Sequence, residues 1–242
     1  MADAVLGNKH NVIVHWGELG LGKTTLMIKQ ILWLVLRFDY HVKMPNTTGC
    51  GFPDESGCLH DHLCVHWQEA LEKVDFTFWE VRKRIKYAVM NNRRLLVMGW
   101  DDLGVYFHKS NIMYMHPEVK DFFSKYNFVR PYMANLIITV PDISFVPGQL
   151  LTFCTGDVWI DRRGHGDFDR GKLMRNFWGS KPSWTKHYDG VDVVWTKAPD
   201  DVYKVYEGMR HEHAVEAFKK PEEIFVTAMP KAKEFAEEDS LF

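Results

Sequence analysis

Residues 17–24 are Gly17-Glu18-Leu19-Gly20-Leu21-Gly22-Lys23-Thr24, which match the phosphate-binding spacing Gly-x4-Gly-Lys-Thr. In such a glycine-rich loop the backbone N–H groups can point at phosphate oxygens, because no side chains stand in the way. A lysine at this position supplies charge for the β- and γ-phosphates, and the threonine hydroxyl can bind Mg²⁺. We expect ATP with Mg²⁺ to be held by Gly17, Glu18, Leu19, Gly20, Leu21, Gly22, Lys23, Thr24 and Thr25.

The segments on either side of this loop agree with it. Residues 12–16 form a short, mostly apolar run that predicts a buried strand, and residues 25–37 predict an apolar helix. A glycine-rich turn can produce the spacing by chance, but a strand, a loop and a helix in this order favour a phosphate site.

A nucleotide site of this kind also needs an acidic element. The apolar run of residues 95–100 predicts a strand, and Asp101 and Asp102 follow it directly. We expect Asp101 to belong to the Mg²⁺ shell and Asp102 to polarise the attacking water. The alternative is a solvated Asp-Asp turn after a core strand.

A third buried strand is predicted over residues 135–141, with Thr139 near its carboxyl end. Thr139 stands where a γ-phosphate sensor would be, so Lys23, Asp102 and Thr139 form the predicted catalytic set. Ligands of open α/β sheets bind outside the carboxyl ends of the strands, where these elements would meet. Thr139 could also be no more than a β-branched residue suited to a strand.

These three elements, in this order, resemble those of the additional-strand ATPases. Within that class the chain is similar to the initiator and helicase-loader branch of the AAA+ proteins, and more closely to small P-loop ATPases of crenarchaeal viruses and plasmids. Two segments carry the closer resemblance, which covers about residues 11–210. They are Trp100-Asp101-Asp102-Leu103-Gly104-Val105-Tyr106, similar to Trp-Asp-Asp-Ala-Gly-Val-Trp, and residues 199–210, similar to Pro-x-x-Val-Tyr-x-x-Tyr-x-x-x-Arg.

The resemblance implies a three-layer α/β P-loop NTPase with a mainly parallel sheet, a β-hairpin and a C-terminal helical segment. It also implies an oligomeric ATPase that acts on DNA. The chain departs from the family twice: Asp102 stands where many relatives have a catalytic Glu, and residues 50–66 lie outside the family pattern. The first departure puts the hydrolysis rate in question, and the second points to an insertion.

ATPases of this class normally place a cation on the γ-phosphate, often an arginine from a neighbouring subunit. The candidates in this chain are Arg130, Arg162, Arg163 and Arg210. The sequence does not choose among them, and Arg130 and Arg210 could equally form structural ion pairs.

Length and composition set the outer limits. The 242 residues, 46% of them hydrophobic, suffice for one main domain with a full core. We expect a core over residues 1–155 with a Cys/His-rich insertion at about 45–66, a hairpin and helical portion of the same domain over 156–230, and a disordered acidic tail over 231–242. No signal peptide or membrane-length apolar run is present, so we expect a protein of the cytoplasm, of the host if viral, without a membrane partner.

Charge gives only a local signal for DNA. The chain has 30 Lys and Arg against 32 Asp and Glu, but residues 156–186 have seven Lys and Arg against four Asp, with aromatic residues between them. Such a mixture suits nucleic acid. Within this segment residues 157–170 predict a β-hairpin, which could equally be a solvated hairpin whose aromatic residues pack on the sheet.

The Cys/His-rich stretch is a possible Zn²⁺ site. Its candidate ligands are Cys50, Cys58, His60 and Cys64, which are soft sulfur and imidazole groups at short spacing. The alternative is an ordinary loop followed by a strand, with His60, His62, Cys64 and His66 on one strand face.

Two function classes remain open. The first is an ATPase that couples nucleotide turnover to DNA handling. The second is a small-molecule phosphotransferase resembling nucleoside and nucleotide kinases, in which the segment from Arg162 to Arg175 would close on the donor phosphates. Paired aspartates after a long apolar strand favour the first class, and the lack of an Asn-Lys-x-Asp segment disfavours a GTPase.

Overall fold

The structure is a computed structural model that describes residues 9–38, 61–103, 117–170, 174–175, 184–185 and 191–219. The chain forms two compact units, residues 1–202 and residues 203–242. The predicted acidic tail over 231–242 and most of the predicted insertion, including Cys50, Cys58 and His60, lie outside the described residues.

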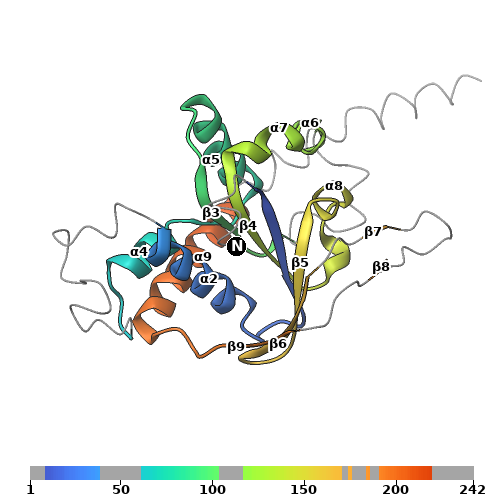
Figure 1. Cartoon of the computed structure of the whole chain (residues 1–242). Coiled ribbons are helices and arrows are strands. Elements are labelled where there is room, and N and C mark those ends of the chain that lie inside the picture. The colour runs from blue at the N-terminus through green and yellow to red at the C-terminus, as the bar shows by residue number, and fades with distance from the viewer. Residues whose placement is uncertain are drawn as a thin grey trace, which may run out of the picture. The chain divides into compact units, whose positions relative to one another are not determined.

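A seven-stranded sheet with the order β2-β3-β4-β1-β5-β6-β9 forms the centre of the first unit (Figure 1). The five strands from β2 to β5 pair in parallel, and β6 and β9 extend the sheet antiparallel. The prediction of an α/β fold with a mainly parallel sheet is therefore confirmed. The strands are β1 (Asn11–Trp16), β2 (Val74–Asp75), β3 (Leu95–Trp100), β4 (Met133–Val140), β5 (Cys154–Arg162), β6 (His165–Arg170) and β9 (Val191–Val194).

A separate two-stranded sheet consists of β7 (Met174–Arg175) and β8 (Trp184–Thr185). The helices are α2 (Lys23–Phe38), α4 (Val65–Leu71), α5 (Phe78–Met90), α6 (Pro117–Ser124), α7 (Tyr126–Val129), α8 (Gly148–Leu151) and α9 (Asp200–Lys219). Two short 3₁₀ helices are η3 (Arg130–Tyr132) and η4 (Ile143–Phe145).

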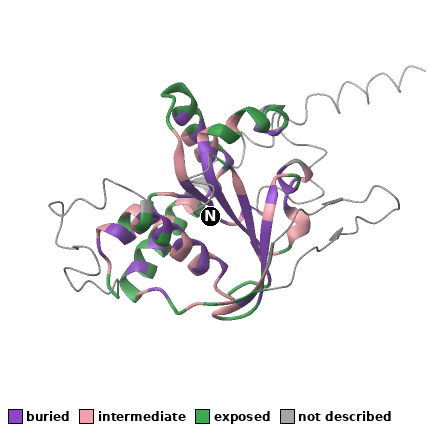
Figure 2. Cartoon of the chain, in the orientation of Figure 1, coloured by how far each residue is buried: buried purple, intermediate pink, exposed green. Residues whose placement is uncertain are grey.

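Helices cover both faces of the sheet, as the alternation along β1 shows. Val12 and Val14 belong to a core cluster that also contains buried residues of α5, α6 and α8. Ile13 points to the other face and packs with Leu26 of α2, and α4 packs on α2. The arrangement is compatible with a three-layer α/β fold, and Figure 2 shows the buried strands between partly exposed helices.

Strand β4, the middle one of the five parallel strands, is buried along all eight of its residues. Its one amide side chain, Asn135, donates to the Leu96 carbonyl at 3.1 Å and accepts from the Asn11 side chain at 3.3 Å. Buried polar groups need such partners to offset desolvation. Asn135 thereby links β4 to the strands on both of its sides.

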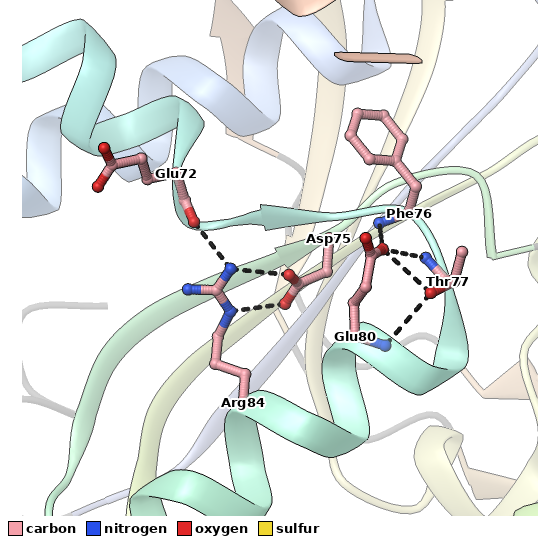
Figure 3. A network of polar contacts seen from close by, with 6 residues as sticks. All are labelled: Glu72, Asp75, Phe76, Thr77, Glu80 and Arg84. Atoms are coloured by element: carbon pink, nitrogen blue, oxygen red, sulfur yellow. Dashed lines mark hydrogen bonds and ion pairs between the residues drawn. The ribbon is translucent and has the colours of Figure 1, made fainter. Parts of the chain in front are cut away.

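The short strand β2 is held in place by the polar network in Figure 3. The Arg84 guanidinium donates to both carboxylate oxygens of buried Asp75 at 2.8 Å, and also to the Glu72 carbonyl. The side chains of Thr77 and Glu80 form a capping box at the start of α5. Because the Asp101 N–H donates to the Asp75 carbonyl at 2.9 Å, this network also supports the end of β3.

The prediction of a strand that carries His60, His62, Cys64 and His66 was wrong for the residues from 61 onward, which the structure describes. Residues 61–64 have no regular structure, and α4 begins at Val65. The buried residues of α4 are His66, Trp67, Ala70 and Leu71, which recur at helical spacing and line one face. An alternation read over a few polar residues missed this helical period.

Residues 203–219 of the second unit are the continuation of α9. The rings of Tyr203 and Tyr206 are in contact on this helix, with centroids 6.0 Å apart. In the described part of the chain, no helix has both the length and the apolar composition needed to cross a membrane.

The buried histidines give the fold a testable pH dependence. Burial lowers the pKa of both His10 and His15 to about 4. Unfolded histidine has a pKa of about 6.5, so between these values the unfolded chain binds more protons and the free energy of unfolding falls as the pH falls. For His15 alone we expect a loss of about 2 kcal/mol between pH 8 and pH 5, measured by urea unfolding.

His15→Gln removes one titrating group and should flatten this dependence by about that amount. His62→Gln is the matched control, because the His62 side chain is exposed. Equal pH dependence in the wild type and His15→Gln would contradict the prediction.

Candidate functional site

Residues 17–22 connect β1 to α2 at the carboxyl end of the parallel strands. The conformation of this loop requires glycine at its first position, since Gly17 has a φ of 140°. A Cβ at Gly17 would also lie 2.4 Å from the Ile160 carbonyl oxygen of β5. The Gly17 N–H donates to the Pro141 carbonyl at 3.2 Å, so the loop starts in contact with the segment after β4.

Lys23 is the first residue of α2, and its side chain is only 8% exposed. Its ammonium group donates to the carbonyls of Gly17 at 2.8 Å and Glu18 at 2.7 Å. Burial lowers the pKa of Lys23, while the carboxylates of Asp102 and Asp101 act in the opposite direction. The loop thus holds the lysine ammonium group against two of its own backbone carbonyls.

Two hydroxyl side chains from separate elements meet at the carboxylate of Asp101. The Thr24 hydroxyl of α2 donates to Asp101 Oδ1 at 3.0 Å, and the Thr139 hydroxyl of β4 donates to the same oxygen at 2.5 Å. Asp101 is only 2% exposed. A carboxylate buried to this extent needs such donors, so its position depends on both hydroxyls.

Asp102 lies beside this group in a backbone conformation that side chains rarely adopt, with a φ of 52°. The backbone N–H of Asp102 donates to the Thr139 hydroxyl oxygen at 2.8 Å, and this hydrogen bond helps to stabilise the conformation. Burial lowers the pKa of Lys23, and the Asp102 carboxylate is close enough to oppose this effect in part. The structure therefore brings together the predicted set of Lys23, Thr24, Asp101, Asp102 and Thr139.

The oxygen atoms around Asp101 fit a hard divalent cation. Two neighbouring ligands of an octahedral Mg²⁺, each at 2.0–2.1 Å, lie about 2.9 Å apart. The Thr24 hydroxyl oxygen and Asp101 Oδ1 are 3.0 Å apart, so both could be ligands of one Mg²⁺ once the hydroxyl proton turns away from Asp101. Both are oxygen donors of the kind that Mg²⁺ prefers.

The other flank of the loop is covered by residues far away in the sequence. Arg163, in the turn between β5 and β6, donates to the Gly20 carbonyl at 3.0 Å. Trp195 follows β9, and its indole ring lies beside Gly22. The backbone N–H of Trp195 donates to the Gly164 carbonyl at 2.9 Å, so the two segments that cover the loop are hydrogen-bonded to each other.

Trp195 was missed in the sequence analysis. It comes directly after a four-residue strand, and no local pattern places that strand beside β6. Arg84 and Asp75, which support the end of β3, were missed for the same reason. A bond between side chains of different elements leaves no periodic signal in either segment.

The four candidate arginines occupy different places. Arg162 and Arg163 are both exposed, and Arg163 contacts Gly20 of the glycine-rich loop. Arg130 precedes β4, at the opposite end of the sheet from the loop, and its guanidinium lies 5.1 Å from the centre of the Phe153 ring. Arg210 is an exposed residue of the second unit.

The predicted β-hairpin exists as β5 and β6. Its described side chains are mixed in charge, with Arg162 and Arg163 against Asp157, Asp161 and Asp167. Trp159 is 42% exposed and stacks on Trp16, with ring centroids 6.0 Å apart. The Trp16 indole N–H donates to Asp157 at 2.8 Å. These aromatic residues thus belong in part to the sheet surface, as the second interpretation of the hairpin expected.

Among the predicted zinc ligands only Cys64 is described. Its sulfur is buried and lies 3.9 Å from Nδ1 of His66. Cys50, Cys58 and His60 lie outside the described residues, so zinc binding by this stretch stays a prediction.

Comparison of the sequence with protein-family models finds no match, and comparison with curated proteins finds none either.

Proposed function

We propose that this chain is a Mg²⁺-dependent P-loop ATPase that couples ATP hydrolysis to DNA handling. The process would be replication initiation, helicase loading or genome packaging in a virus or mobile element, with the chain as a homo-oligomer in the cytoplasm. One observation carries the ATPase part of the proposal. The carboxylate of Asp101 accepts from both Thr24, next to the loop lysine, and Thr139.

The strand order supports the same assignment. β4 lies between β1, which leads into the loop, and β3, which leads into the acidic pair. An extra strand in this position is the arrangement implied by the resemblance to the additional-strand ATPases. Because of it, Thr139 reaches Asp101 and Asp102 from the neighbouring strand.

The residues divide the chemical work as follows. The N–H groups of the loop and the ammonium of Lys23 bind the phosphates, and Thr24 with Asp101 would hold the Mg²⁺. When bound, the ion neutralises charge on the β- and γ-phosphate oxygens. Asp102 is half-buried at the carboxyl end of the sheet, where its carboxylate can accept a hydrogen bond from the attacking water. Thr139 fixes the backbone of Asp102 and so positions its side chain.

The coupling to DNA rests on the family resemblance and on the basic and aromatic composition of residues 156–186. The same segment contains the observation that favours the second candidate function, a small-molecule phosphotransferase. Arg163 already contacts Gly20, as an arginine of a lid over the donor phosphates would.

Removing the loop cation tests the site. Lys23→Ala should weaken ATP binding about 10- to 100-fold, because hydrogen bonds to charged groups contribute about 1.5–3 kcal/mol. Binding can be measured by calorimetric titration with ATP and Mg²⁺. Lys29→Ala is the matched control, since Lys29 belongs to the same helix and bonds to Thr196 instead of the loop. Undiminished ATP affinity in Lys23→Ala would refute the assignment of the loop.

The two aspartates should have separable roles. Asp102→Asn should keep ATP affinity but slow hydrolysis about 10²- to 10⁴-fold, because an amide cannot act as a base toward water. Asp101→Asn should instead raise the Mg²⁺ concentration needed for half-maximal turnover, since one anionic ligand is lost. Steady-state hydrolysis over a Mg²⁺ series measures both effects. The opposite pattern would exchange the two roles, and wild-type turnover in both variants would refute the acidic site.

The two candidate functions predict different responses to added substrates. We expect single- or double-stranded DNA to change the rate of ATP hydrolysis, and we expect nucleosides and nucleoside monophosphates to remain unphosphorylated. Phosphate release with and without DNA, and chromatography of the nucleoside products, measure the two outcomes. Phosphorylated products without any DNA effect would favour the phosphotransferase.

A further inference from the structure

We propose that His165, Asp167 and Asp192 bind a divalent transition-metal ion, such as Zn²⁺, that fastens β9 to β6. This site is separate from the predicted Mg²⁺ position and from the Cys/His-rich stretch. It goes beyond the proposed ATPase function and does not require it.

The three residues are brought together by strand pairing. Asp167 of β6 and Asp192 of β9 are direct partners in the antiparallel register, and His165 is two residues from Asp167 on the same strand. Residues two apart on a strand share a face, so all three side chains stand on one side of the sheet. One potential ligand atom from each lies within 4.8 Å of the other two.

These side chains project on the face opposite α2. Val158 of β5 and Val193 of β9 pack with Leu26 of α2, and the residues that alternate with them point the other way. The ligands are therefore not buried beneath α2, and the side chain of Asp192 is exposed. An ion can reach the site from solvent.

A second carboxylate orients the imidazole. Nδ1 of His165 lies 2.6 Å from Oδ1 of Asp161 on β5. Metal-binding histidines commonly donate one ring N–H to a carboxylate, which fixes the tautomer and strengthens the other nitrogen as a ligand. With Nδ1 bonded to Asp161, Nε2 keeps its lone pair for a metal. This contact distinguishes the site from a simple patch of acidic residues.

Charge supplies an independent reason. Like charges directly opposite each other on paired strands are destabilising, and Asp167 faces Asp192. Within the described residues, neither carboxylate forms an ion pair with a lysine or arginine. A cation between the two carboxylates would turn their repulsion into two favourable contacts.

The ligand set indicates the class of ion. Carboxylates suit Mg²⁺, Ca²⁺ and Mn²⁺, whereas imidazole suits Zn²⁺ and its first-row neighbours. One imidazole with two carboxylates therefore favours Zn²⁺ over Mg²⁺. Three protein ligands leave a coordination position for water.

The ion would stabilise the segments that cover the phosphate loop. β9 is one of the two edge strands of the sheet, and Trp195 follows it directly. Trp195 is bonded to Gly164, beside the arginine that contacts Gly20. Fixing β9 on β6 would hold both contacts in place.

The test uses Zn²⁺ alone, on the full chain without nucleotide. Calorimetric titration and thermal unfolding should show Zn²⁺ binding that raises Tm, with Mg²⁺ at the same concentration having a smaller effect. Asp192→Asn and His165→Gln should each weaken this binding at least about 10-fold, and Asp161→Asn should weaken it about 10- to 100-fold through the orientation of His165.

Two matched variants locate the ion. His62→Gln removes a histidine that also contacts an aspartate but belongs to no such three-ligand group among the described residues, and it should bind Zn²⁺ as the wild type does. Asp101→Asn removes the carboxylate at the phosphate loop and should leave the calorimetric Zn²⁺ affinity of this site unchanged. Unchanged Zn²⁺ affinity in Asp192→Asn and His165→Gln would overturn the proposal.

A further measurement separates this site from the cysteines. Co²⁺ bound by imidazole and carboxylates lacks the intense near-ultraviolet absorption of Co²⁺ bound by thiolates. We expect bound Co²⁺ to give a spectrum without thiolate absorption. We expect Asp192→Asn to lose this Co²⁺ spectrum. Thiolate absorption that is lost in Cys58→Ser would place the ion in the Cys/His-rich stretch and overturn the proposal. When a chelator removes free metal ions, Asp192→Asn should have a Tm at least as high as that of the wild type, because the substitution relieves the repulsion with Asp167.

Discussion

The buried carboxylate of Asp101 constrains the site more than any other group. It lies at the end of a core strand with almost no access to water, so its charge must be met by donors from the protein. Thr24 and Thr139 supply them from α2 and β4. Their two hydrogen bonds require the ends of three elements to lie within a few ångströms, and the order of the sheet provides this proximity.

The opposite flank of the loop obeys a steric constraint. Gly17 approaches β5 so closely that a single methyl group would collide with the Ile160 carbonyl. The loop is therefore packed against β5, and the hairpin that β5 begins contacts it again through Arg163. Hydrogen bonds define one side of the loop, and close packing defines the other.

The sequence predicted those parts of the site that depend on patterns within short, continuous segments. Loop spacing, the acidic pair after an apolar strand and the position of Thr139 are local patterns, and parallel strands bring their carboxyl ends to one edge. Trp195 beside Gly22 and Asp167 opposite Asp192 depend instead on how β9 pairs with β6. That pairing spans a long connection and has no local signal. The strand expected around His66 failed for a related reason, since a few alternating polar residues outweighed the helical spacing of the apolar ones.

Under the proposed function, the contacts of Lys23 explain how the loop can be both stable and ready to bind an anion. Removing an ammonium group from water is costly, and the lowered pKa of Lys23 reflects that cost. The Gly17 and Glu18 carbonyls offset part of it, but each is a neutral acceptor. A phosphate group is anionic, so its oxygens make stronger, shorter bonds to the same ammonium group. The carbonyl contacts thus hold the lysine in position. An anionic ligand would still bind the ammonium group more strongly than these carbonyls do, whereas a neutral ligand would not.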